Sequence, residues 1–457
     1  MRVVLLNPRR SGVLQTHRYG VGHLGLGYVA ACLLQKGHDV RVIDAQTEFL
    51  HRPVVVQRIR DYAPSMLGVT AMTHEIHEAA RICAAVKALL PRCVTVVGGP
   101  HATALPERTL REFPCIDAAV IGEGELTACE LAEAVDSAAK RSRWSSIAGI
   151  AYRDGNETHR TRARPFLADL SAIPFPAWHL FPPQAQWPVY AGRGCPFRCA
   201  FCQRVLGGKI RLRTVDSVLA EFDAMERQLN RKGTWFQDET FGVNRAWTGR
   251  FLDRLIRRNQ AKGYVWRWKA NSHVNLADGR LYRKMRQAGC YGLDFGVESG
   301  CQRMLERIHK NISLQQARRA IALAKEAGLR TTAFFIIGHP GETWETALQT
   351  VRFAPRSGAD NIAVGVMVPY PGTEIWQLAQ AGRFGYRLLS EDWRLYDKYF
   401  GGSLELARLS RRQLEFLQAL TYLSFHLGRK RFKALGKMLG RFRQEAFHMT
   451  KRMLRLA

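Results

Sequence analysis

Three cysteines lie within eight residues in the segment AGRGCPFRCAFC, residues 191–202: they are Cys195, Cys199 and Cys202. Iron–sulfur clusters are normally held by four thiolates and structural zinc by four protein ligands, so a compact three-cysteine loop leaves one metal position for another ligand. No second cysteine pair stands nearby to complete a zinc site. The spacing therefore predicts a [4Fe-4S] cluster with one open iron, and a zinc knuckle completed by a distant residue is the alternative.

The cysteine loop opens a region of alternating strand and helix patterns. Strands are predicted over residues 235–237, 267–270, 292–297, 331–338 and 361–368. Repeated βα units of this length indicate an open or partial (β/α)6 barrel of the TIM type, which we place at residues 187–385. Beyond Asp392 the strand signal ends, so residues 386–457 are predicted to be a basic helical region.

The N-terminal part has the pattern of a second α/β domain, placed at residues 1–150 and joined to the barrel by a proline-rich linker at 151–186. Strands are predicted at residues 3–6, 39–43, 66–70, 94–97 and 118–121, with helices such as 24–35 and 75–90 between them. This alternation indicates a Rossmann-like parallel sheet. Ligands of such sheets bind at the carboxyl ends of strands, so the loops at 70–73, 98–101 and 122–125 are the candidate binding loops.

The overall composition is that of a globular chain with an unusual charge. The 457 residues carry a formal net charge of +29, and the excess of Lys and Arg is densest near the C-terminus. Such a charge attracts nucleic acid or anionic lipid. Outside the C-terminal tail, however, no stripe of interleaved basic and aromatic residues is recognisable, and no known RNA-binding module is present, which disfavours a nucleic-acid partner. The sequence has no signal-peptide pattern and no apolar run long enough to span a bilayer, so a cytoplasmic protein is expected.

The cysteine loop, including the aromatic residue before its third cysteine, resembles the signature of the radical S-adenosylmethionine (SAM) superfamily. FQDETF at 236–241, GLDFGVESG at 292–300, GHPGET at 338–343 and PYPGT at 369–373 resemble later motifs of that superfamily. One departure is His273, where related enzymes often carry Arg. The resemblance implies that SAM chelates the open iron and is cleaved to a 5'-deoxyadenosyl radical. It assigns these residues to SAM: Phe201, Asp238 or Glu239, Glu298 and Ser299.

The combination of the two domains resembles the cobalamin-binding class of that superfamily, over residues 1–375. The segments LGLGYVAA at 24–31, GHDV at 37–40, VGGPHAT at 97–103 and GEGE at 122–125 carry the resemblance. A D-x-H-x-x-G motif, which supplies a cobalt ligand in many cobalamin proteins, is absent, so cobalamin is expected to bind without cobalt ligation by His101. A domain that has lost its cofactor is the alternative. The residues assigned to cobalamin are Thr70, Thr73, Gly98, Gly99, His101, Gly122 and Glu123.

Together these resemblances imply a radical SAM enzyme that uses cobalamin to methylate an unactivated carbon of a small-molecule or lipid-like substrate. A cobalamin-dependent oxidative cyclase or rearrangement enzyme is the alternative within the class; an RNA-modifying protein and a non-catalytic cobalamin sensor are alternatives outside it. An electron donor such as flavodoxin or ferredoxin is implied as a partner. Apolar residues recur every three or four positions from Phe432 to Leu456, which predicts a basic amphipathic helix that packs on the barrel or contacts a membrane surface.

Overall fold

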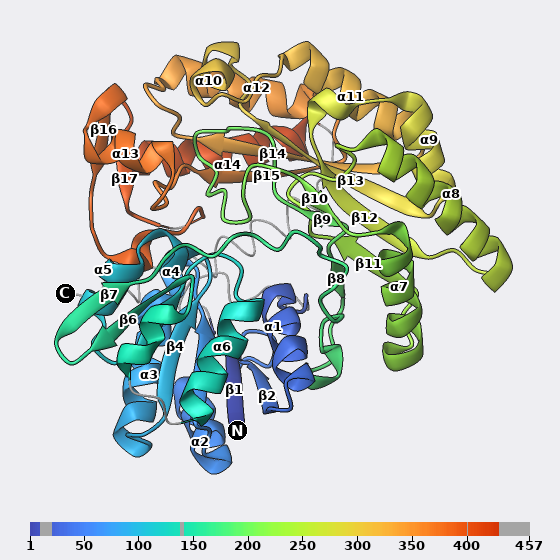
Figure 1. The fold of residues 1–457 in the computed structure, drawn as a ribbon. Coiled ribbons are helices and arrows are strands. Elements are labelled where there is room, and N and C mark those ends of the chain that lie inside the picture. Colours follow the sequence, from blue (N-terminus) through green and yellow to red (C-terminus); the bar gives the residue numbers. More distant parts are fainter. Residues whose placement is uncertain (10–20, 138–140, 400, 429–457) are drawn as a thin grey trace. The chain divides into compact units, whose positions relative to one another are not determined.

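The protein is described by a computed structural model covering residues 1–9, 21–137, 141–399 and 401–428 (Figure 1). These residues form two compact units. Residues 1–9, 21–137, 141–196 and 203–238 belong to the first unit, and residues 197–202, 239–399 and 401–428 to the second. The predicted amphipathic helix from Phe432 to Leu456 lies outside the described residues.

A seven-stranded sheet in the order β2-β1-β3-β4-β5-β6-β7 forms the core of the first unit. Strands β1 to β5 are parallel, whereas β6 and β7 are antiparallel. The order reverses between β1 and β3, and the carboxyl ends of strands at such a reversal border the crevice where open α/β sheets bind ligands. The strands are β1 (Arg2–Asn7), β2 (Asp39–Asp44), β3 (Met66–Thr70), β4 (Val94–Gly98), β5 (Ala118–Val120), β6 (Ile150–Asp154) and β7 (Glu157–Arg160).

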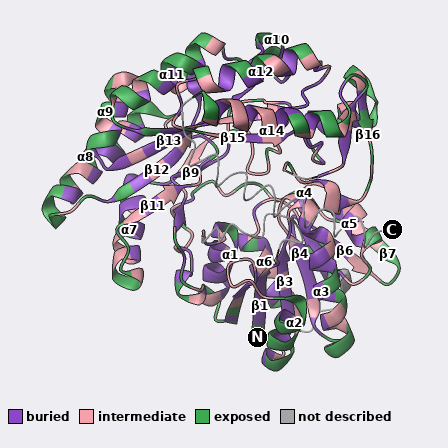
Figure 2. Ribbon diagram, turned by 180° about the vertical axis from the view of Figure 1, so that it is seen from behind, coloured by how far each residue is buried: buried purple, intermediate pink, exposed green. Residues whose placement is uncertain are grey.

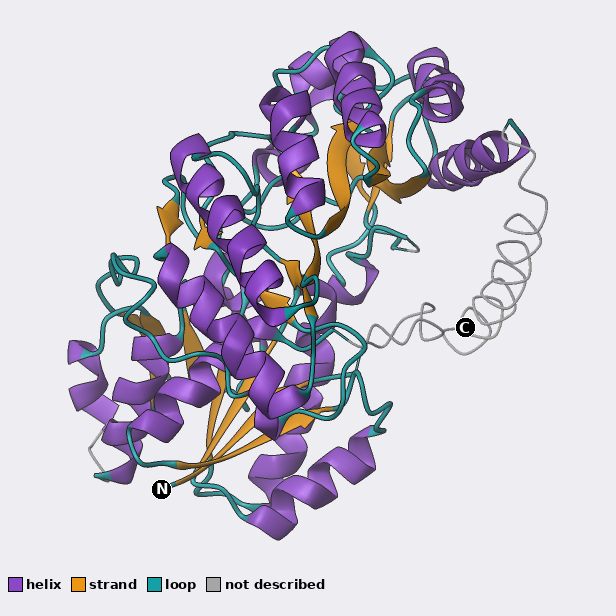
Figure 3. Ribbon diagram, turned by 90° about the vertical axis from the view of Figure 1, so that its right-hand side faces the viewer, coloured by secondary structure: helices purple, strands orange, loops and turns teal. Residues whose placement is uncertain are grey.

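Helices cover this sheet, and Figure 3 shows them flanking the strands. Helix α1 packs against α6 and α2 packs against α3. Strand β1 is buried continuously rather than in alternation (Figure 2), as expected for a parallel strand covered on both faces. The helices are α1 (Leu24–Gln35), α2 (Arg52–Tyr62), α3 (Ile76–Leu89), α4 (Pro100–Ala104), α5 (Pro106–Glu112) and α6 (Glu125–Asp136).

Several short elements complete the first unit. Strands β6 and β7 form a hairpin that continues the sheet into the stretch predicted as a linker. Farther along the chain, β8 pairs with β11 in parallel and β9 pairs with β10 in antiparallel. These elements are β8 (Pro188–Val189), β9 (Gly192–Arg193), β10 (Arg211–Leu212), α7 (Val215–Leu229) and β11 (Gly233–Phe236).

Parallel strands β12, β13, β14 and β15 form consecutive neighbours in the second unit. Helices alternate with them along the chain, which confirms the predicted βα repeats. The strands are β12 (Arg267–Ser272), β13 (Cys290–Glu298), β14 (Arg330–Ile337) and β15 (Asn361–Val366). The helices are α8 (Arg245–Lys262), α9 (Gly279–Gln287), α10 (Gln302–Arg307), α11 (Leu314–Glu326), α12 (Trp344–Arg356), α13 (Glu374–Gln380) and α14 (Arg411–Leu427).

The prediction that strands end before Asp392 is wrong in one detail. Strand β16 (Tyr386–Leu388) pairs in antiparallel with β17 (Leu404–Leu406), which lies after that residue. Each strand has three residues, too few to display a period-two pattern in the sequence. Among the helices that the structure describes, none has the length and apolar character needed to cross a membrane.

Candidate functional site

The loop that carries the three cysteines begins at a tight hairpin base formed by β9 and β10. Gly194 follows β9 with a φ of +95°, and a Cβ at this position would lie 2.2 Å from the Lys209 carbonyl oxygen. Only glycine fits such a close approach at a positive φ. The Cys195 amide donates to the Gly207 carbonyl at 3.2 Å. The start of the cysteine loop is therefore held by close backbone contacts to the segment that leads into β10.

The three loop thiols differ in exposure from the solitary cysteines. Cys195 and Cys199 are half-buried and Cys202 is exposed, whereas six of the other seven cysteines are buried. Accessible thiols on one loop suit a cluster that is inserted after folding, and three thiolates match an iron–sulfur cluster with one open position. Within the described ranges, no group of three or more His, Cys, Asp or Glu side chains forms a ready-made metal site. Ligation by the three cysteines thus stays a prediction.

An aromatic residue between the first two cysteines stacks on His273. The rings of Phe197 and His273 lie 3.7 Å apart at an angle of 12°. Burial and the nearby Lys310 cation lower the pKa of His273 to about 3, so its imidazole is neutral. The sequence identified His273 as a departure from related enzymes, and the structure places it against the cysteine loop. Phe201, the aromatic residue predicted to contact SAM, is half-buried.

The two candidate carboxylates after β11 have different surroundings. Asp238 is buried, and its two oxygens accept hydrogen bonds from the Ala191 amide at 3.0 Å and the Gly192 amide at 2.7 Å. Glu239 is exposed. The sequence left open which of the two faces SAM. In the structure, both oxygens of Asp238 accept hydrogen bonds from backbone amides at the start of β9. Asp238 therefore stabilises the strand that leads into the cysteine loop.

Glu298, at the end of β13, forms a buried ion pair with Lys310. The Lys310 ammonium lies 2.9 Å from Oε1 of Glu298. Burial lowers the pKa of Lys310, but the negative charges of Glu298 and of the Cys199 and Cys202 thiolates outweigh this effect, so the pKa is raised and the side chain is charged. A Cβ at Gly296 would lie 2.1 Å from the Glu298 carboxylate, which explains the second glycine of the G-x-x-x-G-x-E-S motif.

Lys310 is a site residue that sequence reasoning missed. It follows α10 in a connection without hydrophobic periodicity, so no local pattern distinguishes it from a surface lysine. Ser299, which the sequence did identify, is fully buried. Its hydroxyl accepts from the Cys301 amide at 3.1 Å and lies 3.2 Å from the Thr350 hydroxyl. Ser299 therefore shapes the turn after Glu298.

The loops predicted to bind cobalamin meet at the carboxyl ends of β3 and β4. The Ala71 amide donates to the Gly98 carbonyl at 3.0 Å. Gly99 has a φ of +97°, and a Cβ there would lie 3.0 Å from both the Ala71 carbonyl and the Thr70 hydroxyl. The structure thus brings together the predicted residues Thr70, Gly98 and Gly99. It leaves no room for a side chain at Gly99.

Two polar side chains behind these loops are buried. Burial, with smaller contributions from His77 and Arg108, lowers the pKa of His101 to about 3, so this imidazole is neutral. The Thr73 hydroxyl is buried and has no hydrogen-bond partner among the described residues. An unsatisfied buried hydroxyl is unfavourable and is expected to be satisfied by a ligand or water. A corrin with peripheral amides fits this requirement.

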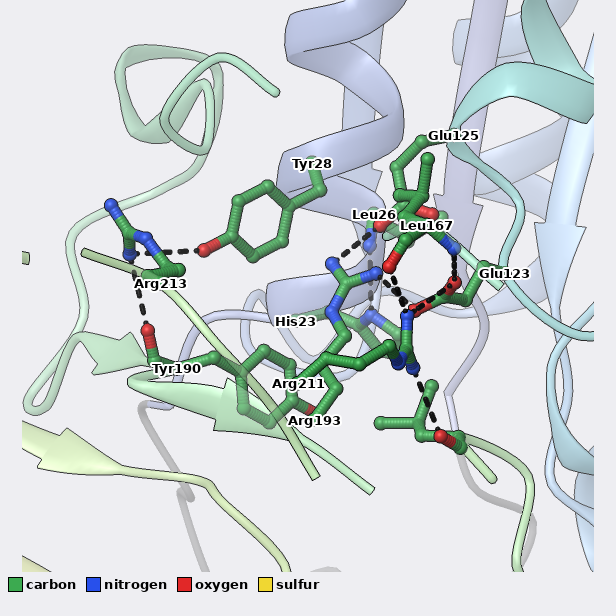
Figure 4. A network of polar contacts seen from close by, with 11 residues as sticks. His23, Leu26, Tyr28, Glu123, Glu125, Leu167, Tyr190, Arg193, Arg211 and Arg213 are labelled. Carbon is green, nitrogen blue, oxygen red and sulfur yellow. Dashed lines mark hydrogen bonds and ion pairs between the residues drawn. The ribbon is translucent and has the colours of Figure 1, made fainter. Parts of the chain in front are cut away.

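The loop after β5 contains the last two predicted cobalamin residues. The Gly122 amide donates to the Thr103 hydroxyl at 3.0 Å, and a Cβ at Gly122 would meet no atom within 4 Å. Space is therefore available at this loop. The Glu123 carboxylate instead accepts hydrogen bonds from Arg193, from Arg211 and from the Leu167 amide (Figure 4). Its side chain is engaged within the protein, which leaves the backbone of the loop for ligand contact.

Comparison with protein families matches two segments of this chain. Residues 10–132 match the model of the B12 binding domain, and residues 189–354 match that of the radical SAM superfamily. The first match contains the loops at the ends of β3, β4 and β5. The second contains the cysteine loop, Glu298 and Lys310. The two matches therefore coincide with the two groups of predicted site residues.

Individual proteins resemble the chain over most of its length. An uncharacterized methyltransferase of Pyrococcus horikoshii, PH0819, is 33% identical over 93% of both chains. The anaerobic magnesium-protoporphyrin IX monomethyl ester cyclase of Rubrivivax gelatinosus is 31% identical over 77% of this chain and 65% of its own length. The structure of the radical SAM methyltransferase TsrM from Kitasatospora setae, with cobalamin and a [4Fe-4S] cluster bound, has a TM-score of 0.73, 18% identity and coverage of 93% of this chain and 90% of its own.

Proposed function

Because this chain belongs to the family of radical SAM enzymes that carry a B12-binding domain, we propose that it methylates an unactivated carbon of a small-molecule substrate. The observation that carries the proposal is the accessible three-cysteine loop close to the buried pair of Lys310 and Glu298. The identity of 33% to a methyltransferase over 93% of both chains supports the type of reaction. A non-catalytic binding protein does not require a cluster in which one iron is open to SAM.

Each cofactor has a set of residues to hold it. Cys195, Cys199 and Cys202 bind the [4Fe-4S] cluster, and the buried charges of Glu298 and Lys310 support a role in binding the charged groups of SAM. The cluster, SAM and cobalamin together supply the radical and methyl-transfer chemistry, so the protein mainly binds, orients and shields them. Phe201, Glu239 and the turn at Ser299 complete the proposed SAM site, and Asp238 supports it through the backbone of β9.

Cobalamin is held by the strand-end loops of the first sheet. Gly98, Gly99 and Gly122 allow close backbone approach, and the Thr70 and Thr73 hydroxyls offer hydrogen bonds. His101 contacts the corrin region without binding cobalt, because the D-x-H-x-x-G pattern that supplies a cobalt ligand is absent. The reaction requires an electron donor of the flavodoxin or ferredoxin type.

Radical oxidative cyclisation is the second candidate function. The identity of 31% to a magnesium-protoporphyrin ester cyclase supports it, although this chain spans 65% of that relative. The family membership and the accessible cysteine loop favour an enzyme over the RNA-binding alternative. A lipid-like substrate and membrane contact through residues 429–457 remain part of the proposal because of the basic amphipathic pattern there.

Anaerobic reconstitution of the full chain with iron, sulfide and hydroxocobalamin tests the proposal. With SAM and a low-potential reductant, the wild-type protein should form 5'-deoxyadenosine, and its Co(II) spectrum should lack nitrogen hyperfine splitting from the protein. Changing Cys195, Cys199 or Cys202 to Ala should abolish SAM cleavage, because a cluster held by two thiolates is readily lost.

The matched control is Cys115→Ala, which removes a half-buried thiol outside both candidate sites and should leave SAM cleavage intact. Mass spectrometry of candidate substrates then separates methylation from cyclisation, since the first adds a methyl group and the second does not. Formation of 5'-deoxyadenosine by the triple cysteine variant would refute the proposed cluster site.

A further inference from the structure

Two arginines oppose each other directly at the base of the cysteine loop. Arg193 on β9 is the register partner of Arg211 on β10. Like charges placed directly opposite on paired strands destabilise the pairing. A two-residue antiparallel pair has few backbone hydrogen bonds to offset this repulsion. The hairpin therefore needs anionic partners to hold its two arginines together.

Glu123 and Glu125 supply those partners. Arg193 donates to Glu123 at 2.9 Å and to Glu125 at 2.6 Å, and Arg211 donates to both oxygens of Glu123 at 2.9 Å. The side chains of Arg193, Glu123 and Glu125 are each 4% exposed. Figure 4 shows both guanidinium groups directed at the Glu123 carboxylate. Two cations and two anions thus form a charge-balanced cluster, which we call the arginine–glutamate clamp.

Other groups of the first unit enclose the clamp. The Arg193 guanidinium lies 5.0 Å from the ring centroid of Tyr28. Arg211 also donates to the Leu167 carbonyl at 2.8 Å and to the Leu206 carbonyl at 2.9 Å. The clamp therefore combines several charge-assisted hydrogen bonds in a site shielded from solvent, where such bonds are strong and geometrically specific.

The clamp joins two segments of the first unit that belong to different family matches. Glu123 and Glu125 lie in the segment matched by the B12 binding domain, beside Gly122 at the end of β5. Arg193 lies in the segment matched by the radical SAM superfamily, two residues before Cys195. Well-packed apolar residues would give equal or greater stability, whereas buried ion pairs are better attested as devices that fix one register. The placement therefore points to positioning rather than to stability alone.

We propose that Arg193 is a positioning residue for the iron–sulfur cluster, held by Glu123 and Glu125 and backed by Arg211. The clamp fixes the start of the cysteine loop relative to the loop after β5, so that the cluster ligand Cys195 and the cobalamin-binding loop keep one geometry. The inference rests on the proposed function. According to this inference, Glu123 has two roles. It lies beside the proposed cobalamin site, and it orients Arg193, which in turn positions the cluster ligand Cys195.

The test compares the reconstituted full-length wild type with Arg193→Lys, which keeps the charge but loses the two-pronged guanidinium contact. The electron paramagnetic resonance spectrum of the reduced cluster, recorded with and without SAM, is the readout that a merely structural role would not change. We expect the variant to fold, to show an altered SAM-induced spectral shift, and to cleave SAM about 10- to 100-fold more slowly, as for other residues that orient metal ligands. Glu125→Gln should show the same spectral change.

Arg52→Lys is the matched control. Arg52 makes a similar two-pronged contact with Glu78, with both hydrogen bonds at 2.8 Å, but it lies in neither proposed cofactor site. Its spectrum and SAM cleavage should equal those of the wild type. If Arg193→Lys fails to fold, Glu125→Asp, which keeps the charge and shortens its reach, provides the same comparison.

Two negative results have different meanings. Wild-type spectra, with and without SAM, in folded Arg193→Lys and Glu125→Gln would overturn the positioning role while leaving the proposed function intact. A wild-type chain that assembles no cluster would overturn the proposed function, and the inference with it.

Discussion

Lys310 and Glu298 form an ion pair in which each partner depends on the other. Their side chains are 7% and 8% exposed, so neither charge is well hydrated. The mutual attraction and the proximity of the cysteine thiols to Lys310 compensate for this loss of hydration. Removal of one partner leaves the other charge buried without a counter-charge. This lowers the free energy of unfolding much more than replacement of both partners by apolar residues does.

Lys310→Met should therefore destabilise the protein and weaken SAM binding. We expect a loss of about 3–5 kcal/mol in the free energy of unfolding, because the Glu298 carboxylate stays buried without its partner. Chemical denaturation measures this loss, and calorimetric titration with SAM measures binding to the reconstituted protein. Lys325→Met, which breaks the more exposed pair with Asp360, should cost at most about 1 kcal/mol. Equal stability of the two variants would contradict this explanation.

The strand ends of the first sheet are the elements that create the proposed cobalamin site. The parallel strands β1, β3 and β4 end at one edge, and the strand order reverses between β1 and β3. Open α/β sheets bind ligands at the edge where such a reversal occurs. Gly99 begins the segment that leads into α4 and lies against the loop after β3. The shape of this edge depends on backbone contact between the two loops rather than on any one side chain.

Gly99→Ala should disturb this edge and impair cobalamin binding. The added Cβ requires a strained φ of +97° and lies 3.0 Å from two oxygens; backbone strain of this kind costs about 1–3 kcal/mol. Thermal unfolding and the absorbance of bound cobalamin after gel filtration provide the measurements. Gly37→Ala is the control, because Gly37 has a φ of +81° but open space around the added Cβ. Cobalamin retention by Gly99→Ala equal to that of Gly37→Ala would argue against the proposed binding edge.

Across the whole molecule, the net charge of +29 is not explained by the described fold. The arginine–glutamate clamp pairs two cations with two anions and therefore does not account for the excess. The basic excess is densest in residues 429–457, where apolar residues such as Phe432, Leu439 and Phe442 recur with helical spacing. A basic amphipathic helix binds anionic lipid through both its apolar face and its charge.

Truncation after Gly428 tests this role and retains the described helix α14, which ends at Leu427. The full chain should sediment with vesicles that contain anionic phosphatidylserine and much less with neutral phosphatidylcholine vesicles, whereas the truncated chain should stay in the supernatant. Added salt should weaken the binding, since it screens the charges involved. Equal sedimentation of both chains, or of neither at low salt, would remove the membrane proposal.

Local patterns in the sequence were sufficient for the architecture and for the chemical type of the site. Cys195, Cys199 and Cys202 lie within one eight-residue segment, and the strands β1 to β5 and β11 to β15 follow from short apolar runs and the turns beside them. Hydrophobic periodicity and motif spacing are properties of neighbouring residues, so they can be read without a fold. Strands β6 to β10, β16 and β17 lie outside the predicted strand ranges. Most of them are too short to display a period-two pattern.

Only the tertiary structure decided which polar groups meet. Arg193 and Glu123 are 70 residues apart, and the stacking of Phe197 on His273 and the pairing of Lys310 with Glu298 likewise join different elements. Burial of these groups makes their pairing strong, yet no sequence period marks it, because the partners lie on separate strands and loops. The sequence therefore determined which cofactors to expect, whereas the packing of the chain determined which side chains hold the loops that bind them.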